Sequence, residues 1–254
     1  MAWRHSRTAT SFLWALVVLA VSFGAAHPSF GASISYGDFG PIPPGITFGN
    51  VTESSGTDAV PLYGAPELVP GGIDFDPTGF VASATSGAQD ITDGQLNLVL
   101  SGSSQVSITS IHLAELGDYS LAGAGTPATQ ALVGAVLHVT VTQINGVDVA
   151  PITLSAANGS ISFNLVVNPG VVQPWSLGVT LDIAAQLGAE QRATRVEVAI
   201  DNQLLALSEL GSLAFIAKKD FRLDVGTEVP EPSLLLLLFG AGTVLSAAAR
   251  RARY

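Results

Sequence analysis

Residues 137–149 read LHVTVTQINGVDV, and this stretch decides the fold class. Apolar and polar side chains alternate from Leu137 to Thr142, which is the period of a strand with one buried face. Asn145-Gly146 follows, the residue pair that a two-residue type I′ turn prefers, and the alternation resumes at Val147. The stretch therefore predicts a β-hairpin.

The sequence on both sides of this hairpin continues the strand pattern. A second Asn-Gly pair, Asn158-Gly159, separates residues 152–154 from residues 161–167 and predicts a second tight turn in a β-meander. Upstream, residues 96–100 and 106–111 alternate with period two, and downstream residues 175–183 do the same.

Two further turns are expected nearer the end of this region. Asp201-Asn202 would join strands at 195–200 and 204–207, and Lys218-Lys219-Asp220 would join strands at 213–216 and 221–225. Residues 184–191 could form one or two turns of helix, and the proline-rich residues 37–94 are expected to mix edge strands with loops. About ten short strands with tight turns predict an all-β domain, an antiparallel β-sandwich or jelly roll, over residues 32–228.

The N-terminus has the pattern of a secretory signal peptide, residues 1–31. Arg4, His5 and Arg7 form a basic region, and residues 12–23 form an apolar segment of the expected length. Small residues then allow cleavage after Ala26 or after Gly31. The protein is therefore predicted to use the export machinery and signal peptidase, with an uncleaved N-terminal anchor as the alternative.

The C-terminus carries three elements in order: Val229-Pro230-Glu231-Pro232, an apolar segment at 233–249, and a basic cluster of Arg250, Arg251 and Arg253. The prolines favour an extended segment, the apolar segment is just long enough to cross a bilayer as a helix, and the arginines favour the cytoplasmic side. This order resembles the PEP-CTERM sorting signal of bacterial exported proteins. The resemblance is confined to residues 229–254.

The resemblance implies how the protein is sorted. An exosortase-like enzyme would process the signal, after a transient stay in the inner membrane through helix 233–249. The protein would then reach the cell surface or the extracellular space. A simple tail anchor without processing is the alternative.

The charge of the predicted domain excludes one large class of function. Residues 32–228 hold 19 acidic and five basic residues, a net charge of −14, and no lysine or arginine occurs between Arg7 and Arg192. Nucleic-acid binding needs a basic surface, so it is excluded. The chain also contains no cysteine, which excludes thiol catalysis, disulfides and thiolate metal sites.

Candidate catalytic residues are few. His112, Glu115 and Asp118 lie close in sequence, but on a strand His112 and Glu115 would point to opposite faces, so we expect structural or solvated roles for them. No Gly-x-Ser-x-Gly nucleophile motif is present. Trp175, the only tryptophan of the domain, is expected to be a core or edge anchor and not a platform for a sugar ring.

Four aspartates in glycine-containing segments offer oxygen ligands for calcium: Asp74, Asp76, Asp90 and Asp93. Neither segment matches the EF-hand pattern, and the alternative is that the aspartates cap turns.

These observations favour a surface or extracellular-matrix structural protein with no enzymatic activity and no cofactor, with exopolysaccharide as a further partner. The alternative is a carbohydrate- or calcium-binding β-sandwich module, and a hydrolase is less favoured because it needs two carboxyl groups converging in a cleft.

Overall fold

The computed structural model describes residues 32–103 and 105–229. The predicted signal peptide, Pro230 to Pro232, the predicted helix 233–249 and the arginines at 250, 251 and 253 lie outside these residues. Within the described ranges, none of the helical structure is long and apolar enough to cross a membrane.

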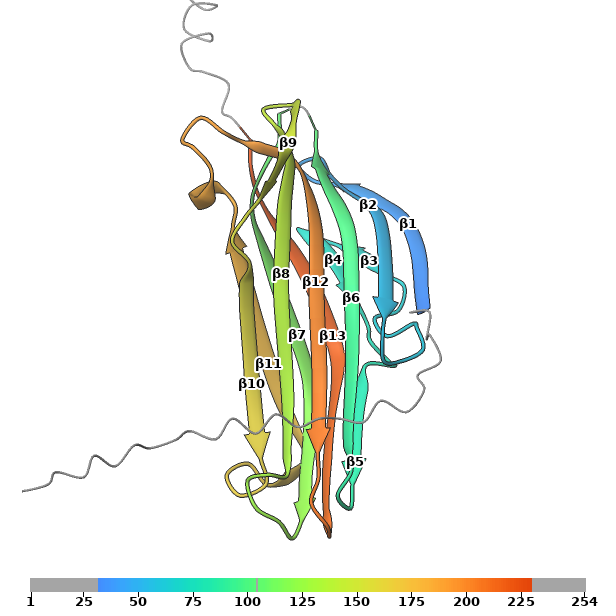
Figure 1. Cartoon of the computed structure of the whole chain (residues 1–254). Coiled ribbons are helices and arrows are strands. Elements are labelled where there is room, and N and C mark those ends of the chain that lie inside the picture. Colours follow the sequence, from blue (N-terminus) through green and yellow to red (C-terminus); the bar gives the residue numbers. More distant parts are fainter. Residues whose placement is uncertain (1–31, 104, 230–254) are drawn as a thin grey trace, which may run out of the picture. The chain divides into compact units, whose positions relative to one another are not determined.

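The described chain is built almost entirely from antiparallel strands in two sheets (Figure 1). The seven-stranded sheet has the order β1-β2-β6-β12-β8-β10, and β9 also pairs with β8. Its strands are β1 (Ala32–Ile42), β2 (Ile46–Ser55), β6 (Gln89–Gly102), β8 (Gln130–Ile144), β9 (Val147–Thr153), β10 (Ala157–Asn164) and β12 (Ala193–Leu207).

The second sheet has six strands in the order β11-β7-β13-β4-β3, and β5 also pairs with β13. Its strands are β3 (Glu67–Val69), β4 (Gly72–Phe75), β5 (Val81–Thr85), β7 (Ser107–Gly123), β11 (Gly170–Asp182) and β13 (Ser212–Glu228). A single 3₁₀ turn, η1 (Ala184–Gln186), lies where one or two helical turns are predicted.

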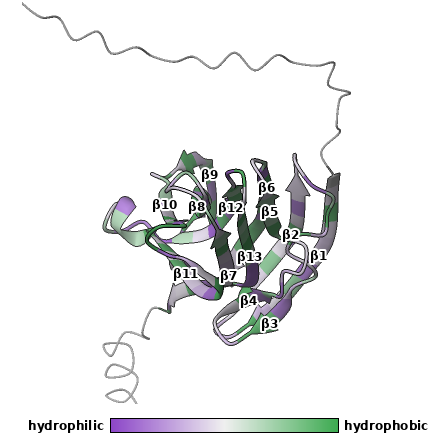
Figure 2. Cartoon of the chain, turned by 90° about the horizontal axis from the view of Figure 1, so that it is seen from below, coloured by the Kyte–Doolittle hydropathy of each residue, from purple (hydrophilic) through white to green (hydrophobic). Residues whose placement is uncertain are grey.

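The two sheets pack face to face, which confirms the predicted antiparallel β-sandwich (Figure 2). The period-two pattern explains how each strand contributes to the core: in β12, Val196, Val198 and Ile200 are buried between the sheets while Glu197 points out. The apolar side chains of both inner faces form one continuous core.

The first predicted hairpin is confirmed, and the second is wrong. Asn145 and Gly146 join β8 to β9 with φ values of 51° and 77°, as a type I′ turn requires. Asn158 and Gly159 instead lie inside β10, opposite Val136 and Ala135 of β8.

The second Asn-Gly pair has a packing role. β10 follows β9 along the same side of β8 and packs there against β11 of the other sheet. A Cβ on Gly159 would lie 3.0 Å from side-chain atoms of both Leu177 and Val179. The glycine therefore serves close packing between the sheets and not a turn.

The two turns predicted near the end of the domain are also wrong. β12 continues through Asp201-Asn202, because both residues are paired with β6 on one side and with β8 on the other. β13 continues through Lys218 to Asp220 with a bulge at that point. Asn202 and Lys218 are buried, so one residue of each predicted turn is a core residue of a long strand.

Candidate functional site

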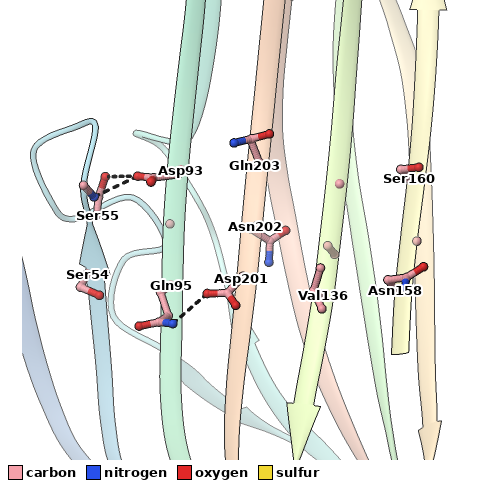
Figure 3. A pocket seen from close by; sticks show the side chains of 15 residues that line it. Ser54, Ser55, Asp93, Gln95, Val136, Asn158, Ser160, Asp201, Asn202 and Gln203 are labelled. Carbon is pink, nitrogen blue, oxygen red and sulfur yellow. Dashed lines mark hydrogen bonds between the residues drawn. The ribbon is translucent and has the colours of Figure 1, made fainter. Parts of the chain in front are cut away.

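A hollow of about 690 Å³ lies on the outer face of the seven-stranded sheet, across five neighbouring strands (Figure 3). We call it the outer groove. The residues that line it are Ser54, Ser55, Gly56, Asp93, Gly94, Gln95, Gly134, Ala135, Val136, Asn158, Gly159, Ser160, Asp201, Asn202 and Gln203.

Strand register builds the groove from two rows of residues. In the first row, each residue is the partner of the next across the sheet; the row is Ser54, Gln95, Asp201, Val136 and Asn158. These positions alternate with buried ones such as Leu96, Ile200 and Leu137, so their side chains point away from the core.

The second row is formed in the same way by Asp93, Gln203, Gly134 and Ser160. Gly134 has no side chain, and a Cβ placed there would meet no atom closer than 3.9 Å. The floor of the groove is therefore lowest at Gly134, between Gln203 and Ser160.

The groove presents both hydrogen-bond donors and hydrogen-bond acceptors. The Gln95 amide donates a hydrogen bond of 2.8 Å to Asp201 Oδ1, and His138 Nε2 lies 3.4 Å from the other carboxylate oxygen of Asp201. Asn158 and Ser160 are exposed on the opposite wall. Carboxylates accept hydrogen bonds, whereas amides and hydroxyls both donate and accept, so this lining can bind a ligand rich in hydroxyl groups.

Asp93 is held at the edge of the groove by hydrogen bonds from the turn that follows β2. Its Oδ1 accepts from Ser55 Oγ at 3.1 Å, from Gly56 N at 2.9 Å, and from the Thr57 N and Oγ1 at 3.0 and 2.9 Å. Burial alone would raise the pKa of Asp93, but these hydrogen bonds outweigh burial and lower it. Asp93 thus fixes a turn, which agrees with the alternative to a calcium site.

The four aspartates considered as calcium ligands form two pairs that belong to different sheets. Asp90 and Asp93 belong to β6, and Asp90 accepts a hydrogen bond of 2.7 Å from Ser83 N. Asp74 lies in β4 of the other sheet, where burial and the nearby Asp220 and Asp76 raise its pKa. In residues 32–103 and 105–229, no three His, Asp or Glu side chains are grouped so that they could hold a metal ion. Calcium binding at these aspartates stays an untested alternative.

The strand periodicity correctly separates His112 from Glu115. His112 is exposed on the outer face of the six-stranded sheet, where its Nδ1 lies 2.8 Å from Thr180 Oγ1. Glu115 is fully buried between the sheets, and Asp118 forms an ion pair with Lys219. Trp175 is 5% exposed and belongs to the core, as predicted.

The outer groove is not visible in the sequence. Its polar residues occupy outward positions of strands, which are polar in most β-sandwiches. Only the order and register of β2, β6, β12, β8 and β10 bring Ser54, Gln95, Asp201 and Asn158 into one row.

No protein-family model matches the sequence, and no curated protein matches it. Among solved structures, the chain is similar to TmCBM61 in complex with β-1,4-galactotriose, at 10% identity over 78% of this chain and 90% of that one, with a TM-score of 0.22. It is similar to lectin I-B4 from Griffonia simplicifolia at 12% identity over 78% of this chain and 100% of that one, with a TM-score of 0.17. The enzymatically active domain of bacteriophage CBA120 tailspike protein 4 matches at 12% identity, over 72% of this chain and 19% of that one, with a TM-score of 0.19.

Proposed function

We propose that this protein is an exported, non-catalytic component of a bacterial surface or extracellular matrix, and that its outer groove binds a polysaccharide chain. The observation that carries the binding part of the proposal is the register-built row of Ser54, Gln95, Asp201 and Asn158 beside the low floor at Gly134. The export part rests on the sequence patterns at the two ends of the chain.

The chemistry of the groove favours a neutral, hydroxyl-rich ligand. Two acceptor side chains, Asp93 and Asp201, lie beside serine, asparagine and glutamine side chains that both donate and accept, which suits neighbouring hydroxyl groups of a sugar. The groove volume of about 690 Å³ is in the range of small-ligand sites. An acidic polymer is disfavoured, because the surrounding domain carries a net charge of −14.

Two features of the groove argue against hydrolysis of the bound sugar. Glycoside hydrolysis needs a carboxylic acid with a raised pKa beside a second carboxylate. Asp93 and Asp201 are the two carboxylates of the groove lining, and the pKa of Asp93 is lowered by its hydrogen bonds. Asp201 is engaged by Gln95. The groove therefore suits binding without catalysis.

Binding can be tested with a variant that fills the groove. Gly134→Leu should abolish retardation of the protein in gels that contain a neutral polysaccharide, because the new side chain occupies the floor. The backbone of Gly134 does not need a positive φ and a Cβ has room, so the variant should remain folded. Asp201→Ala should weaken retardation without filling the groove.

A matched control exists on the other sheet. Gly178 is exposed on β11, and a Cβ there would meet no atom closer than 3.6 Å. Gly178→Leu should therefore leave retardation unchanged. If wild-type protein is retarded by none of a panel of bacterial neutral polysaccharides, or if Gly134→Leu binds as well as wild type, the outer groove is not the binding site.

Export and processing are tested separately. In a host with a matching exosortase, mass spectrometry of the extracellular protein should find that residues after about Pro232 are missing, and substitution of Glu231 should prevent this processing. Recovery of an intact terminus including Arg250 to Tyr254 would refute processing and favour a tail anchor.

A further inference from the structure

The core of the sandwich contains a cluster of titratable and polar side chains that the proposed function does not use. Lys218 of β13 and Glu115 of the adjacent strand β7 come from the six-stranded sheet, and Asn202 of β12 comes from the seven-stranded sheet. Their exposed fractions are 1%, 0% and 3%. The cluster therefore bridges the two sheets in the interior.

Lys218 contacts both other members of the cluster. Its Nζ lies 2.8 Å from Glu115 Oε2 and contacts the side-chain oxygen Oδ1 of Asn202. The amine is thus adjacent to the amide carbon that bears this oxygen. Within the described residues, neither Glu115 oxygen has a hydrogen bond of good geometry, and neither has the Asn202 nitrogen Nδ2.

Aromatic rings enclose the amine and keep it from water. Lys218 Nζ is 4.7 Å from the centroid of Phe80, 5.0 Å from that of Phe221 and 5.6 Å from that of Tyr63. Tyr63 and Phe221 pack edge to face, and Tyr63 is itself fully buried. Such an apolar enclosure removes the hydration of charged groups and therefore destabilises an ionised pair relative to its uncharged form.

Burial shifts the proton from the amine toward the carboxylate. It lowers the pKa of Lys218, with Glu115 partly opposing the shift, and it raises the pKa of Glu115, with Lys218 and Asn202 partly opposing it. Both directions favour an uncharged amine beside an uncharged carboxylic acid. An uncharged amine is a nucleophile, and a buried carboxylic acid can donate and accept protons.

We propose that Lys218 and Asn202 form an intramolecular amide cross-link between the two sheets, with Glu115 as the proton-transfer residue. Lys218 Nζ attacks Cγ of Asn202 and forms a new C–N bond, while the bond from Cγ to Nδ2 breaks. Glu115 donates its proton to Nδ2, which leaves as ammonia, and takes up the proton that Nζ loses, so the carboxyl group ends protonated as it began. The step needs no oxidant, no cofactor and no other reactant.

The alternative role for the same residues is a buried ion pair that stays unreacted. Such a pair also satisfies the geometry, but it leaves the chain with its full mass. The two outcomes are therefore distinguished by covalent chemistry alone, and neither depends on whether the outer groove binds a polysaccharide.

The sequence provides a direct assay for the cross-link. Trypsin cleaves after lysine and arginine, and both Asn202 and Lys218 fall in the tryptic peptide 196–218. An amide on Lys218 blocks cleavage there. The denatured full-length wild-type protein should yield peptide 196–219, lighter by one ammonia molecule and giving no backbone fragments between residues 202 and 218. A peptide 196–218 of full mass from the folded protein would overturn the proposal.

The tryptic assay also separates the cross-link from spontaneous succinimide formation, which releases ammonia at Asn-Gly pairs. Asn145-Gly146 and Asn158-Gly159 lie in a different tryptic peptide, because no lysine or arginine occurs between Arg7 and Arg192. A succinimide at Asn202 would leave cleavage after Lys218 intact. Loss of ammonia together with a missed cleavage at Lys218 is therefore specific for the cross-link.

Three variants assign the roles. Lys218→Met should abolish the ammonia loss, and Glu115→Gln, which keeps the shape of the side chain, should abolish or greatly slow it. Lys219→Ala removes the neighbouring exposed lysine and should leave the cross-link in place. Circular dichroism establishes that each variant is folded. Full cross-linking in folded Glu115→Gln would overturn the role of Glu115.

Discussion

The energetic cost of Glu115 can be measured by removing the amine that faces it. Lys218→Met leaves a carboxyl group with 0% exposure and no positive charge nearby, and breaking a buried pair in this way costs about 3–5 kcal/mol. The double variant Glu115→Gln with Lys218→Met removes both titratable groups. Neither variant can form the Lys218–Asn202 amide, so their difference in unfolding free energy reports the buried carboxylate alone. We expect the double variant to be more stable by about 3–5 kcal/mol at pH 7.

The pH dependence of this difference follows from the raised pKa of Glu115. Below pH about 4, the carboxyl group is protonated in both the folded and the unfolded chain, so the two variants should be nearly equal in stability. As pH rises, the unfolded chain loses this proton while the folded chain keeps it, and the Lys218→Met variant becomes progressively less stable. The difference should stop growing above the pKa of the folded state.

Urea unfolding of both variants, followed by circular dichroism from pH 4 to 8, provides the measurement. At pH 7 the melting temperatures should differ by about 6–20 °C for a domain of this size. Equal stability at pH 7 would refute the argument, because it would mean that Glu115 reaches water or another donor once Lys218 is removed.

Three further predictions follow from individual contacts. Gly146→Val should destabilise the domain by about 1–3 kcal/mol in thermal unfolding, because the φ of 77° at Gly146 strains a β-branched residue although a Cβ there meets no atom. Gly146→Asn should be tolerated better, and equal effects of the two substitutions would argue against backbone strain. Hydrogen bonds lower the pKa of Asp93, so its carboxylate contributes stability above pH about 4 that is lost as pH falls. Asp93→Asn should reduce this acid sensitivity in urea titrations at pH 7 and pH 3, and an unchanged pH profile would contradict the role of Asp93 in fixing the turn. Millimolar calcium added to protein that has been treated with a chelator should leave the melting temperature unchanged, because Asp93 Oδ1 already accepts hydrogen bonds from Ser55, Gly56 and Thr57. A rise in the melting temperature would identify a calcium site.

The sequence predicts the fold class because period-two alternation reports burial directly. It also predicts the first Asn-Gly turn, because the conformation of Asn145 and Gly146 is the one that these two residue types favour locally. It fails at Asn158-Gly159, where contact with Leu177 and Val179 of the other sheet determines the role of the glycine. Packing between distant segments is not visible in a local pattern.

The same limit explains the two false turns and the missed sites. Asn202 and Lys218 interrupt apolar alternation, and polar residues between strands usually indicate a turn. In the structure they contact one another across the core, and Lys218 also contacts Glu115, about a hundred residues away in the sequence. The outer groove likewise depends on strand order, because β6, β12 and β8 are neighbours in the sheet but not in the chain.

The position of β13 determines how the domain carries mechanical force. A pull on the end of β13 at Glu228 runs along a strand that is paired with β7 on one side over almost its whole length, and with β4 and β5 on the other. Extraction of β13 along its own axis must shear many backbone hydrogen bonds at once, and a bond from Lys218 to Asn202 would pass the load to β12 at the centre of the other sheet. The domain is therefore arranged to resist tension applied from its C-terminal end.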